Sequence, residues 1–458
     1  MFRRLRSTPI PGTRDEYTGV DFNLGFHVRS YTLDLAYRVG PNHLSGTAVL
    51  QLDNWKSLKA MTLDLAGSLK VSKVTAAGSG GFTPRVARFR QSDNKLRLTF
   101  AEEIPVDSEF QLQIRYAGSP RPLRTAWGEI GWEELENGAL VASQPNGAPS
   151  WFPCDDTPDE KARYEISVSA DNPYVVIANG ELVGRQAAGS RTTWHYRADF
   201  PMASYLATVQ VGEYQQLDLS GEGQVPVRAW APPELKDLVR DEFADQSAML
   251  ELYSRLFGPY PFPAYTVVVT EDELEIPLEA QGLSIFGSNH AEGDHAWERL
   301  IAHELSHQWF GNSLGLAQWN DIWLNEGFAC YAEWLWFEHS ADRPAADSAR
   351  EFYDELAEKP EDLLLGDPGP EDMFDDRVYK RGALTVHALR CLLGDAAFFA
   401  VLRRYVAAGR HAVVEPRDLK REVLAEANAQ SVPQEVVEKL WDDWLFQREL
   451  PEFPEPRR

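Results

Sequence analysis

The sequence predicts an α+β protein of two parts, an all-β region over residues 1–217 and a mainly helical region over residues 218–458. Two observations predict this division. Short runs of alternating apolar and polar residues fill the chain from about His27 to Val211, a pattern typical of strands with one buried face. After Asp218 the apolar residues take helical spacing, and two proline-free segments follow over residues 298–310 and 321–336.

The strand-like region contains several alternating runs and turn signals. Its runs are SYTLDLAYRV, GTAVLQLD, KLRLTF, FQLQIRYAG, YEISVSA and SYLATVQVGEY. Asn137-Gly138, Asn146-Gly147 and Asn179-Gly180 are tight-turn dipeptides, and the apolar run after Asn179-Gly180 predicts a hairpin at that point. The region is therefore interpreted as one all-β domain.

The second region is predicted to be helical at five places. One helix is expected between Pro232-Pro233 and Gly258-Pro259, because prolines favour a helix start and glycine followed by proline favours its end. The segments 298–310 and 321–336 follow, and then a polar, proline-bearing connection leads to the helical pattern DDRVYKRGALTVHALRCLLG. Helical periodicity continues from Asp395 to about Glu449.

Charge and cysteine usage limit the possible partners. The formal net charge is −25, which argues against nucleic acid because phosphate binding needs a basic surface. The same charge favours cationic ligands such as a peptide amino terminus, or serves only solubility. Cys154, Cys330 and Cys391 show no CxxC spacing, and the N-terminus has no apolar segment typical of a signal peptide. We expect a cytoplasmic protein with free thiols and no membrane partner; the oligomeric state cannot be predicted.

The segment 297–333 contains the residues that indicate chemistry. His303 and His307 are four residues apart, so on a helix both imidazoles point to one side and can reach one ion. Glu304 lies between them and faces a different direction, which suits a general base that later donates a proton to the departing amine. With the observed histidine and acid content, a chance match to His-acid-x-x-His is expected only ~0.03 times in a chain of this length.

Glu326 is the expected third ligand. Eighteen residues separate it from His307, and it lies on the segment 321–336, where most neighbours are apolar and aromatic. A buried carboxylate is costly unless it is paired or binds a metal. Two imidazoles and one carboxylate form a hydrolytic zinc site that leaves a fourth position for water.

These motifs resemble a known family. HELSHQWFGN followed by WLNEGFA resembles the aminopeptidase N family of gluzincin metallopeptidases, in which HExxH, eighteen intervening residues and then a Glu in an NEGFA-like segment follow one another. The resemblance implies a saddle-like β-sandwich followed by a thermolysin-like catalytic domain, one zinc ion, and removal of N-terminal residues from peptides with a free amino terminus. Larger relatives continue into further modules, so we expect a short two-domain, bacterial-type member.

The resemblance also implies substrate-binding residues. In relatives a Gln or Glu ahead of an FPC segment helps to hold the substrate amine, and Gln144 occupies this place in SQPNGAPSWFPC. Relatives also carry a GAMEN-like motif on a strand at the cleft edge, and Ile276–Ala280 align with it, with Glu279 retained. Both residues have an alternative interpretation as surface-loop residues, and the neighbouring Glu271, Asp272, Glu273 and Glu275 fit a solvated acidic loop.

A tyrosine and a supporting polar pair complete the expected site. In relatives a tyrosine at the start of a helix donates a hydrogen bond to the oxyanion, and Tyr379, followed by Lys380, Arg381 and Gly382, matches it. By analogy with other zinc sites, Asn320 and Asp321 are predicted to orient a ligand imidazole.

Three other functions use the same scaffold. A thermolysin-like endopeptidase would have the same metal site without an amine-binding carboxylate. A leukotriene-hydrolysing epoxide hydrolase depends on a C-terminal module that this sequence lacks. A non-catalytic peptide-binding protein usually loses a ligand or the base, whereas His303, Glu304, His307 and Glu326 are all present here.

Overall fold

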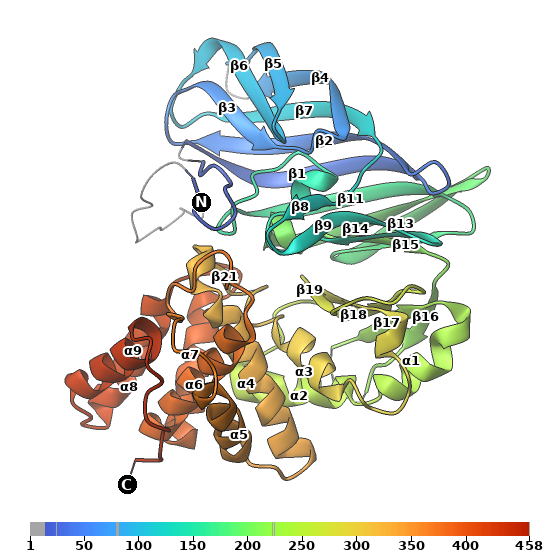
Figure 1. Ribbon diagram of the computed structural model, residues 1–458. Helices are drawn as coiled ribbons and strands as arrows, with labels where there is room; N and C mark the ends of the chain where they lie inside the picture. The colour runs from blue at the N-terminus through green and yellow to red at the C-terminus, as the bar shows by residue number, and fades with distance from the viewer. Residues whose placement is uncertain (1–13, 24, 79–81, 222, 224, 458) are drawn as a thin grey trace.

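The computed structural model describes residues 14–457 except 24, 79–81, 222 and 224. The first thirteen residues, where no signal peptide is predicted, lie outside the described part. Figure 1 shows a strand-rich half, coloured blue to green, stacked on a half that is mainly helical and ends in red. The two-part order predicted from the alternation of the runs is the order found.

Three sheets build the N-terminal half in the described residues. In spatial order the first contains β13 (Glu181–Ala188), β14 (Arg191–Ala203), β11 (Lys161–Asp171), β1 (Phe26–Arg38), β2 (His43–Asn54), β7 (Glu109–Gly118) and β4 (Leu69–Gly78). The second contains β12 (Val175–Ala178), β15 (Val209–Gly212), β10 (Gly138–Ala142), β9 (Gly128–Leu135) and β8 (Leu123–Thr125). The third contains β3 (Leu58–Asp64), β6 (Lys95–Ile104) and β5 (Val86–Ser92).

The alternating runs explain these strands, because every second side chain enters the core. Along β1, Tyr31, Leu33, Leu35 and Tyr37 are buried while the residues between them are more exposed. Most neighbouring strands are antiparallel, but β1 pairs with β11 in parallel. The apolar face of β1 is therefore buried.

Two sequence expectations in this half are wrong. The first part of SYLATVQVGEY forms a short 3-10 turn over Ser204–Leu206 rather than a strand. The Asn179-Gly180 turn joins β12 and β13, which belong to different sheets, so it is no hairpin. The side-chain amide of Asn179 instead binds two other segments, because Nδ2 donates to Leu206 O at 2.9 Å and to Gln281 O at 3.0 Å.

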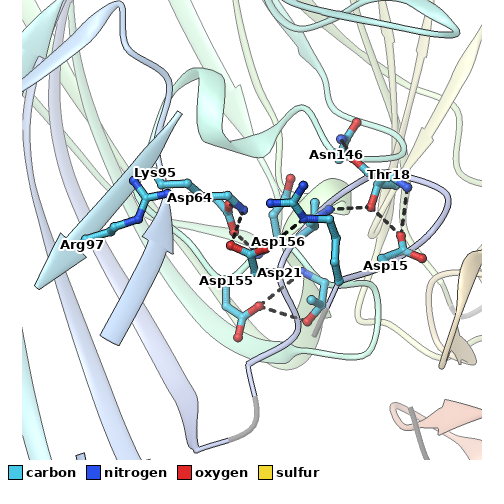
Figure 2. A network of polar contacts seen from close by, with 12 residues as sticks. Asp15, Thr18, Asp21, Asp64, Lys95, Arg97, Asn146, Asp155 and Asp156 are labelled. Atoms are coloured by element: carbon cyan, nitrogen blue, oxygen red, sulfur yellow. Dashed lines mark hydrogen bonds and ion pairs between the residues drawn. The ribbon is translucent and has the colours of Figure 1, made fainter. Parts of the chain in front are cut away.

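A polar network ties the start of the described chain to this half (Figure 2). Lys95 Nζ lies 2.5 Å from Asp64 Oδ1 and 3.6 Å from Asp21 Oδ2. The backbone N–H of Asp156 donates to Asp64 at 3.4 Å, and Asn146 donates to the Thr18 carbonyl at 3.3 Å. The chain around Thr18 and Asp21 is thus fixed against the β-rich half.

The C-terminal half begins with a five-stranded sheet. In spatial order it contains β16 (Gln215–Asp218), β17 (Val227–Ala231), β18 (Tyr265–Val269), β20 (Leu283–Phe286) and β19 (Leu278–Ala280). The sheet membership changes between Gly212 and Gln215, just before the boundary predicted between residues 217 and 218. The edge strand β19 is antiparallel to β20 and lies on the side facing the N-terminal half (Figure 1).

The helices follow this sheet. They are α1 (Lys236–Glu242), α2 (Gln246–Phe257), α3 (Glu298–Ser306), α4 (Trp323–Ser340), α5 (Ala345–Ala357), α6 (Asp376–Leu393), α7 (Asp395–Gly409), α8 (Pro416–Ala429) and α9 (Gln434–Phe446). A small parallel pair, β21 (Gly315–Leu316) and β22 (Val413–Val414), joins the chain after α3 to the chain after α7.

Two helix predictions differ from the structure, and one helix was not predicted. The single helix expected before Gly258 is interrupted between Glu242 and Gln246, where the Phe243 ring packs edge-to-face on Phe286 with ring centroids 4.9 Å apart. The helix expected over residues 298–310 ends at Ser306, although His307 keeps helical backbone angles. The polar, proline-bearing connection before α6, for which no helix was predicted, contains α5, in which Ala345, Ala349 and Leu356 are buried.

The described part of the chain contains no helix that is long and apolar enough to cross a membrane. Cys154, Cys330 and Cys391 are free thiols, and each is buried.

Candidate metal and peptide-binding site

The structure brings the three predicted metal ligands together. His303 lies in the last turn of α3, and His307 directly follows the end of this helix. Glu326 lies in the first turn of α4, and α4 packs against α3. Glu326 Oε2 is 3.4 Å from Nε2 of each histidine. One ligand atom from each residue lies within 4.8 Å of the others, and all three side chains are buried.

The second nitrogen of each imidazole has a partner that fixes the ring. His303 Nδ1 is 2.7 Å from Glu333 Oε1, and His307 Nδ1 donates to the Phe310 carbonyl at 3.0 Å. Because each Nδ1 has an acceptor for a ring proton, each Nε2 is the nitrogen available to bind a metal ion. The carboxylate of Glu333 is in turn held by Arg299 at 3.2 Å.

Glu333 was missed by the sequence reasoning, and the prediction for Asn320 and Asp321 is wrong. Asn320 donates to the Gly366 carbonyl at 3.3 Å and to Asp321 at 3.5 Å, so its bonds point away from the imidazoles. A signal for Glu333 was present, because it follows Glu326 by two helical turns and so shares its face of α4.

The donor set fits zinc. Two imidazole nitrogens and one carboxylate oxygen converge, the outward nitrogen of each ring is already bonded, and this leaves a fourth position on a four-coordinate ion. The surrounding carboxylates of Glu279, Glu304 and Glu326 add negative charge, which favours a divalent cation.

Glu304 lies beside the metal ligands, but its carboxylate belongs to a different group of side chains. Its carboxylate forms a second compact group with His307 and Glu279, again within 4.8 Å. Its Oε2 is buried without a hydrogen-bond partner in the protein. Burial raises the pKa of Glu304 to about 7, against the lowering effect of His303 and His307. A buried acceptor with this orientation is free to take a proton from a bound water molecule.

Tyr379 lies beside the predicted metal ligand His303. It belongs to the first turn of α6, and its ring is nearly parallel to that of His303 with centroids 6.0 Å apart. Burial raises the pKa of Tyr379 well above its usual range, and Glu326 and Glu279 raise it further. The phenol therefore stays protonated and can donate a hydrogen bond.

Glu279 and Gln144 meet across the two halves of the protein. Glu279 lies on β19, and its Oε1 accepts a hydrogen bond from Gln144 Nε2 at 2.7 Å. Burial raises the pKa of Glu279, while His307 lowers it. The two residues, predicted separately from distant segments, form one polar pair beside Glu304 and His307.

The fold and these residues define a metallopeptidase whose His-His-Glu metal site is built from two neighbouring helices, α3 and α4. The model of the peptidase family M1 domain matches residues 242–444, and that of the peptidase M1 N-terminal domain matches residues 27–206. A mutant of a two-domain M1 zinc metallopeptidase bound to L-tryptophan is 30% identical, with a TM-score of 0.83 over 96% of this chain and 99% of that chain. The chain belongs to peptidase family M1. The family resemblance and the α+β fold class predicted from the sequence are confirmed.

Other proteins that this chain is similar to are also M1 metallopeptidases or aminopeptidases. The M1 zinc metallopeptidase from Deinococcus radiodurans is 29% identical, with a TM-score of 0.84 over 97% of this chain and 99% of that one. Aminopeptidase M1-D from Oryza sativa subsp. japonica is 26% identical over 92% of this chain, which spans only 50% of that relative. Leucine aminopeptidase 2 from Coccidioides immitis (strain RS) is 24% identical over 98% of this chain and 75% of the relative. The chain thus matches two-domain members over almost their whole length and the rice enzyme over half.

Proposed function

We propose that this chain is a zinc-dependent aminopeptidase that removes single residues from peptides with a free amino terminus. The observation that carries the proposal is the pair Glu279–Gln144 beside the metal ligands. A carboxylate next to a hydrolytic site pairs with a substrate ammonium group and sets which peptide bond is presented. The named aminopeptidases among its relatives support the same activity.

His303, His307 and Glu326 would hold the zinc ion. When bound, zinc makes a water molecule more acidic and polarises the scissile carbonyl. Glu304 would accept a proton at Oε2 from the attacking water and would later deliver it to the departing amine nitrogen. Tyr379 donates its hydroxyl hydrogen to the carbonyl oxygen as negative charge develops there.

Glu279 and Gln144 bind the other end of the first residue. Glu279 would accept hydrogen bonds from the α-ammonium group of the substrate. The amide oxygen of Gln144 is a further acceptor, while the Gln144 Nε2 group donates to Glu279. An N-acetylated peptide lacks the positive charge of the α-ammonium group and two of its N–H donors. It would leave a buried carboxylate without its partner.

The experiment compares aminoacyl fluorogenic substrates with their N-acetylated counterparts, before and after treatment with a chelator and after zinc is restored. We expect cleavage of the free-amine substrates only, lost with chelator and regained with zinc. Equal rates on free and acetylated peptides would instead support the endopeptidase alternative.

The Glu304→Gln variant separates catalysis from mere binding. We expect it to retain stoichiometric zinc and to lose ~100- to 10,000-fold in kcat, because Gln cannot accept the proton. Near-normal turnover in this variant would show that the base is assigned to the wrong residue. No turnover in the unmodified protein with full zinc would favour the non-catalytic peptide-binding alternative.

We also propose that the protein acts in the cytoplasm as a soluble enzyme without nucleic-acid partners. The three buried free thiols and the net charge of −25 support this proposal. Fractionation of cells with antibodies against the protein tests it, and recovery with the membrane or secreted fraction would contradict it.

A further inference from the structure

Two amide side chains follow the second metal-binding histidine and are buried without contacting the metal-ligand atoms. Gln308 and Asn312 belong to the motif HELSHQWFGN and are both 0% exposed. A buried amide costs free energy unless its donors and acceptors are satisfied. Their partners therefore indicate what these residues do.

Both side chains bind the backbone at the end of the strand that carries Glu279. Gln308 Nε2 donates to the Ala280 carbonyl at 3.0 Å, and Asn312 Nδ2 donates to the same oxygen at 2.9 Å. Gln308 Oε1 accepts from the Gly282 N–H at 2.7 Å. Ala280 directly follows Glu279, so these bonds fix the backbone next to the amine-binding carboxylate.

The strand β19 needs this support because its own pairing is short. It spans only Leu278–Ala280, pairs with β20 on one side alone, and is preceded by Pro277, which has no N–H to donate. Backbone groups at a sheet edge need other partners when they are buried. Gln308 and Asn312, which follow the metal-binding histidine in the chain, supply these hydrogen-bond partners.

The two amides are themselves tied to the metal ligands. Gln308 is the next residue after His307, and the Asn312 N–H donates to the His307 carbonyl at 3.0 Å. Lys161 Nζ holds the same loop by donating to the carbonyls of Asn312 at 2.9 Å and Ser313 at 2.8 Å. A continuous path of short contacts therefore joins the second metal ligand to the backbone beside Glu279.

We propose that Gln308 and Asn312 are positioning residues that set the distance between Glu279 and the metal site, and so confine cleavage to the first peptide bond. The inference rests on the proposed aminopeptidase function and adds residues that touch neither metal nor substrate. A displacement of ~1 Å in a positioning group can cost ~100-fold in rate. Loss of these bonds therefore affects use of the free amine more than metal binding.

Two variants test the inference. Asn312→Asp keeps the shape but turns an oxygen toward the Ala280 carbonyl, and Gln308→Met keeps the approximate size but removes both bonds. Each variant leaves the other amide in place. The readouts are KM and kcat on a free-amine substrate, the rate on its N-acetylated counterpart, bound zinc, and the midpoint of thermal unfolding.

Asn54 offers a matched control in the N-terminal half. Its Nδ2 donates to the carbonyls of Lys56 at 2.6 Å and Pro105 at 2.7 Å, and its Oδ1 accepts from the Ser108 N–H at 3.0 Å. Asn54→Asp thus disturbs an equally buried amide far from the site in the chain. We expect it to lower thermal stability and to leave KM unchanged.

We expect Asn312→Asp and Gln308→Met to bind zinc fully, to raise KM for the free-amine substrate ~10-fold or more, and to lose much of the preference over the acetylated substrate. Unchanged KM and preference in both folded variants would overturn the inference. Loss of the fold in both, with Asn54→Asp still folded, would also overturn it by showing a general structural role. Glu279→Gln separates the two proposals: if it keeps the preference for a free amine, the amine-binding role itself fails.

Discussion

Gly327 and Gly382 meet where α4 crosses α6. A Cβ placed on Gly327 would come within 2.7 Å of the Gly382 backbone, and a Cβ on Gly382 would lie 2.8 Å from Gly327 Cα. Gly327 follows the metal ligand Glu326, and Gly382 lies three residues beyond Tyr379. The absence of side chains at both positions therefore sets how closely Tyr379 approaches the metal site.

Gly382→Ala should both destabilise the protein and lower kcat. The added methyl group must push α6 away from α4, at a cost of ~1–3 kcal/mol, and Tyr379 moves with α6. Urea unfolding and steady-state kinetics measure the two effects. Gly40→Ala is the control, since a Cβ there meets nothing within 4 Å; an equal, small effect in both variants would refute the role of the crossing.

Glu333→Gln should weaken zinc binding ~10- to 100-fold. The carboxylate bonded to His303 Nδ1 makes that imidazole a better metal ligand, and loss of such a partner has an effect of this size. Competition with a chromogenic chelator measures the dissociation constant. Glu338→Gln provides the comparison, because Glu338 lies on the same helix and pairs with Arg390 rather than with a histidine. Equal zinc affinity in the two variants would contradict the assignment.

Tyr379→Phe should lower kcat by ~100- to 1,000-fold with little change in zinc content. The loss arises because one hydrogen bond to the developing oxyanion disappears, while the ring still packs beside His303. Tyr353→Phe controls for loss of a bonded hydroxyl, since Tyr353 OH donates to the Pro451 carbonyl at 2.9 Å, away from the metal ligands. If Tyr379→Phe turned over as fast as the control, another donor would have to be sought.

Local spacing allowed much of the site to be predicted. The four-residue interval between His303 and His307 needs only one helical turn, and the alternation in β1 needs only one buried face. The partners that depend on packing could not be found in this way. Glu333 reaches His303 only because α3 and α4 pack together, and Phe243, at the interruption between α1 and α2, contacts Phe286 from a distant segment.

The Gln144–Glu279 contact is a second case in which local sequence patterns do not predict a long-range contact. Each residue could be matched to a family motif, but their 2.7 Å hydrogen bond depends on how the β-rich half sits on β19. The Asn179-Gly180 dipeptide has a strong local turn signal, yet its amide bonds to Leu206 and Gln281 instead of closing a hairpin. Local sequence signals therefore indicate which residues turn or bind, and long-range packing decides what they contact.

The network in Figure 2 contains a carboxyl group that is poorly satisfied in the folded protein. Asp156 is 1% exposed, and its Oδ1 accepts a hydrogen bond from Ser204 at 2.6 Å, whereas its Oδ2 has no hydrogen-bond partner in the protein. Burial raises the pKa of Asp156 well above its usual range, and Asp64 and Asp155 raise it further, while Ser204 and Lys95 oppose the shift.

Asp156→Asn should make the protein more stable at pH 8 and leave its stability unchanged near pH 4. The raised pKa means that the folded state binds more protons than the unfolded state above the ordinary Asp pKa of ~3.9, so this group's contribution to stability falls as pH rises toward its folded pKa. The amide resembles the protonated acid and avoids a penalty of ~1–3 kcal/mol for a buried, unsatisfied group. Urea unfolding at pH 4, 6 and 8 measures the difference, with Asp354→Asn as the exposed control. A variant that is less stable than the unmodified protein at pH 8 would show that Asp156 is ionised and stabilised by Lys95.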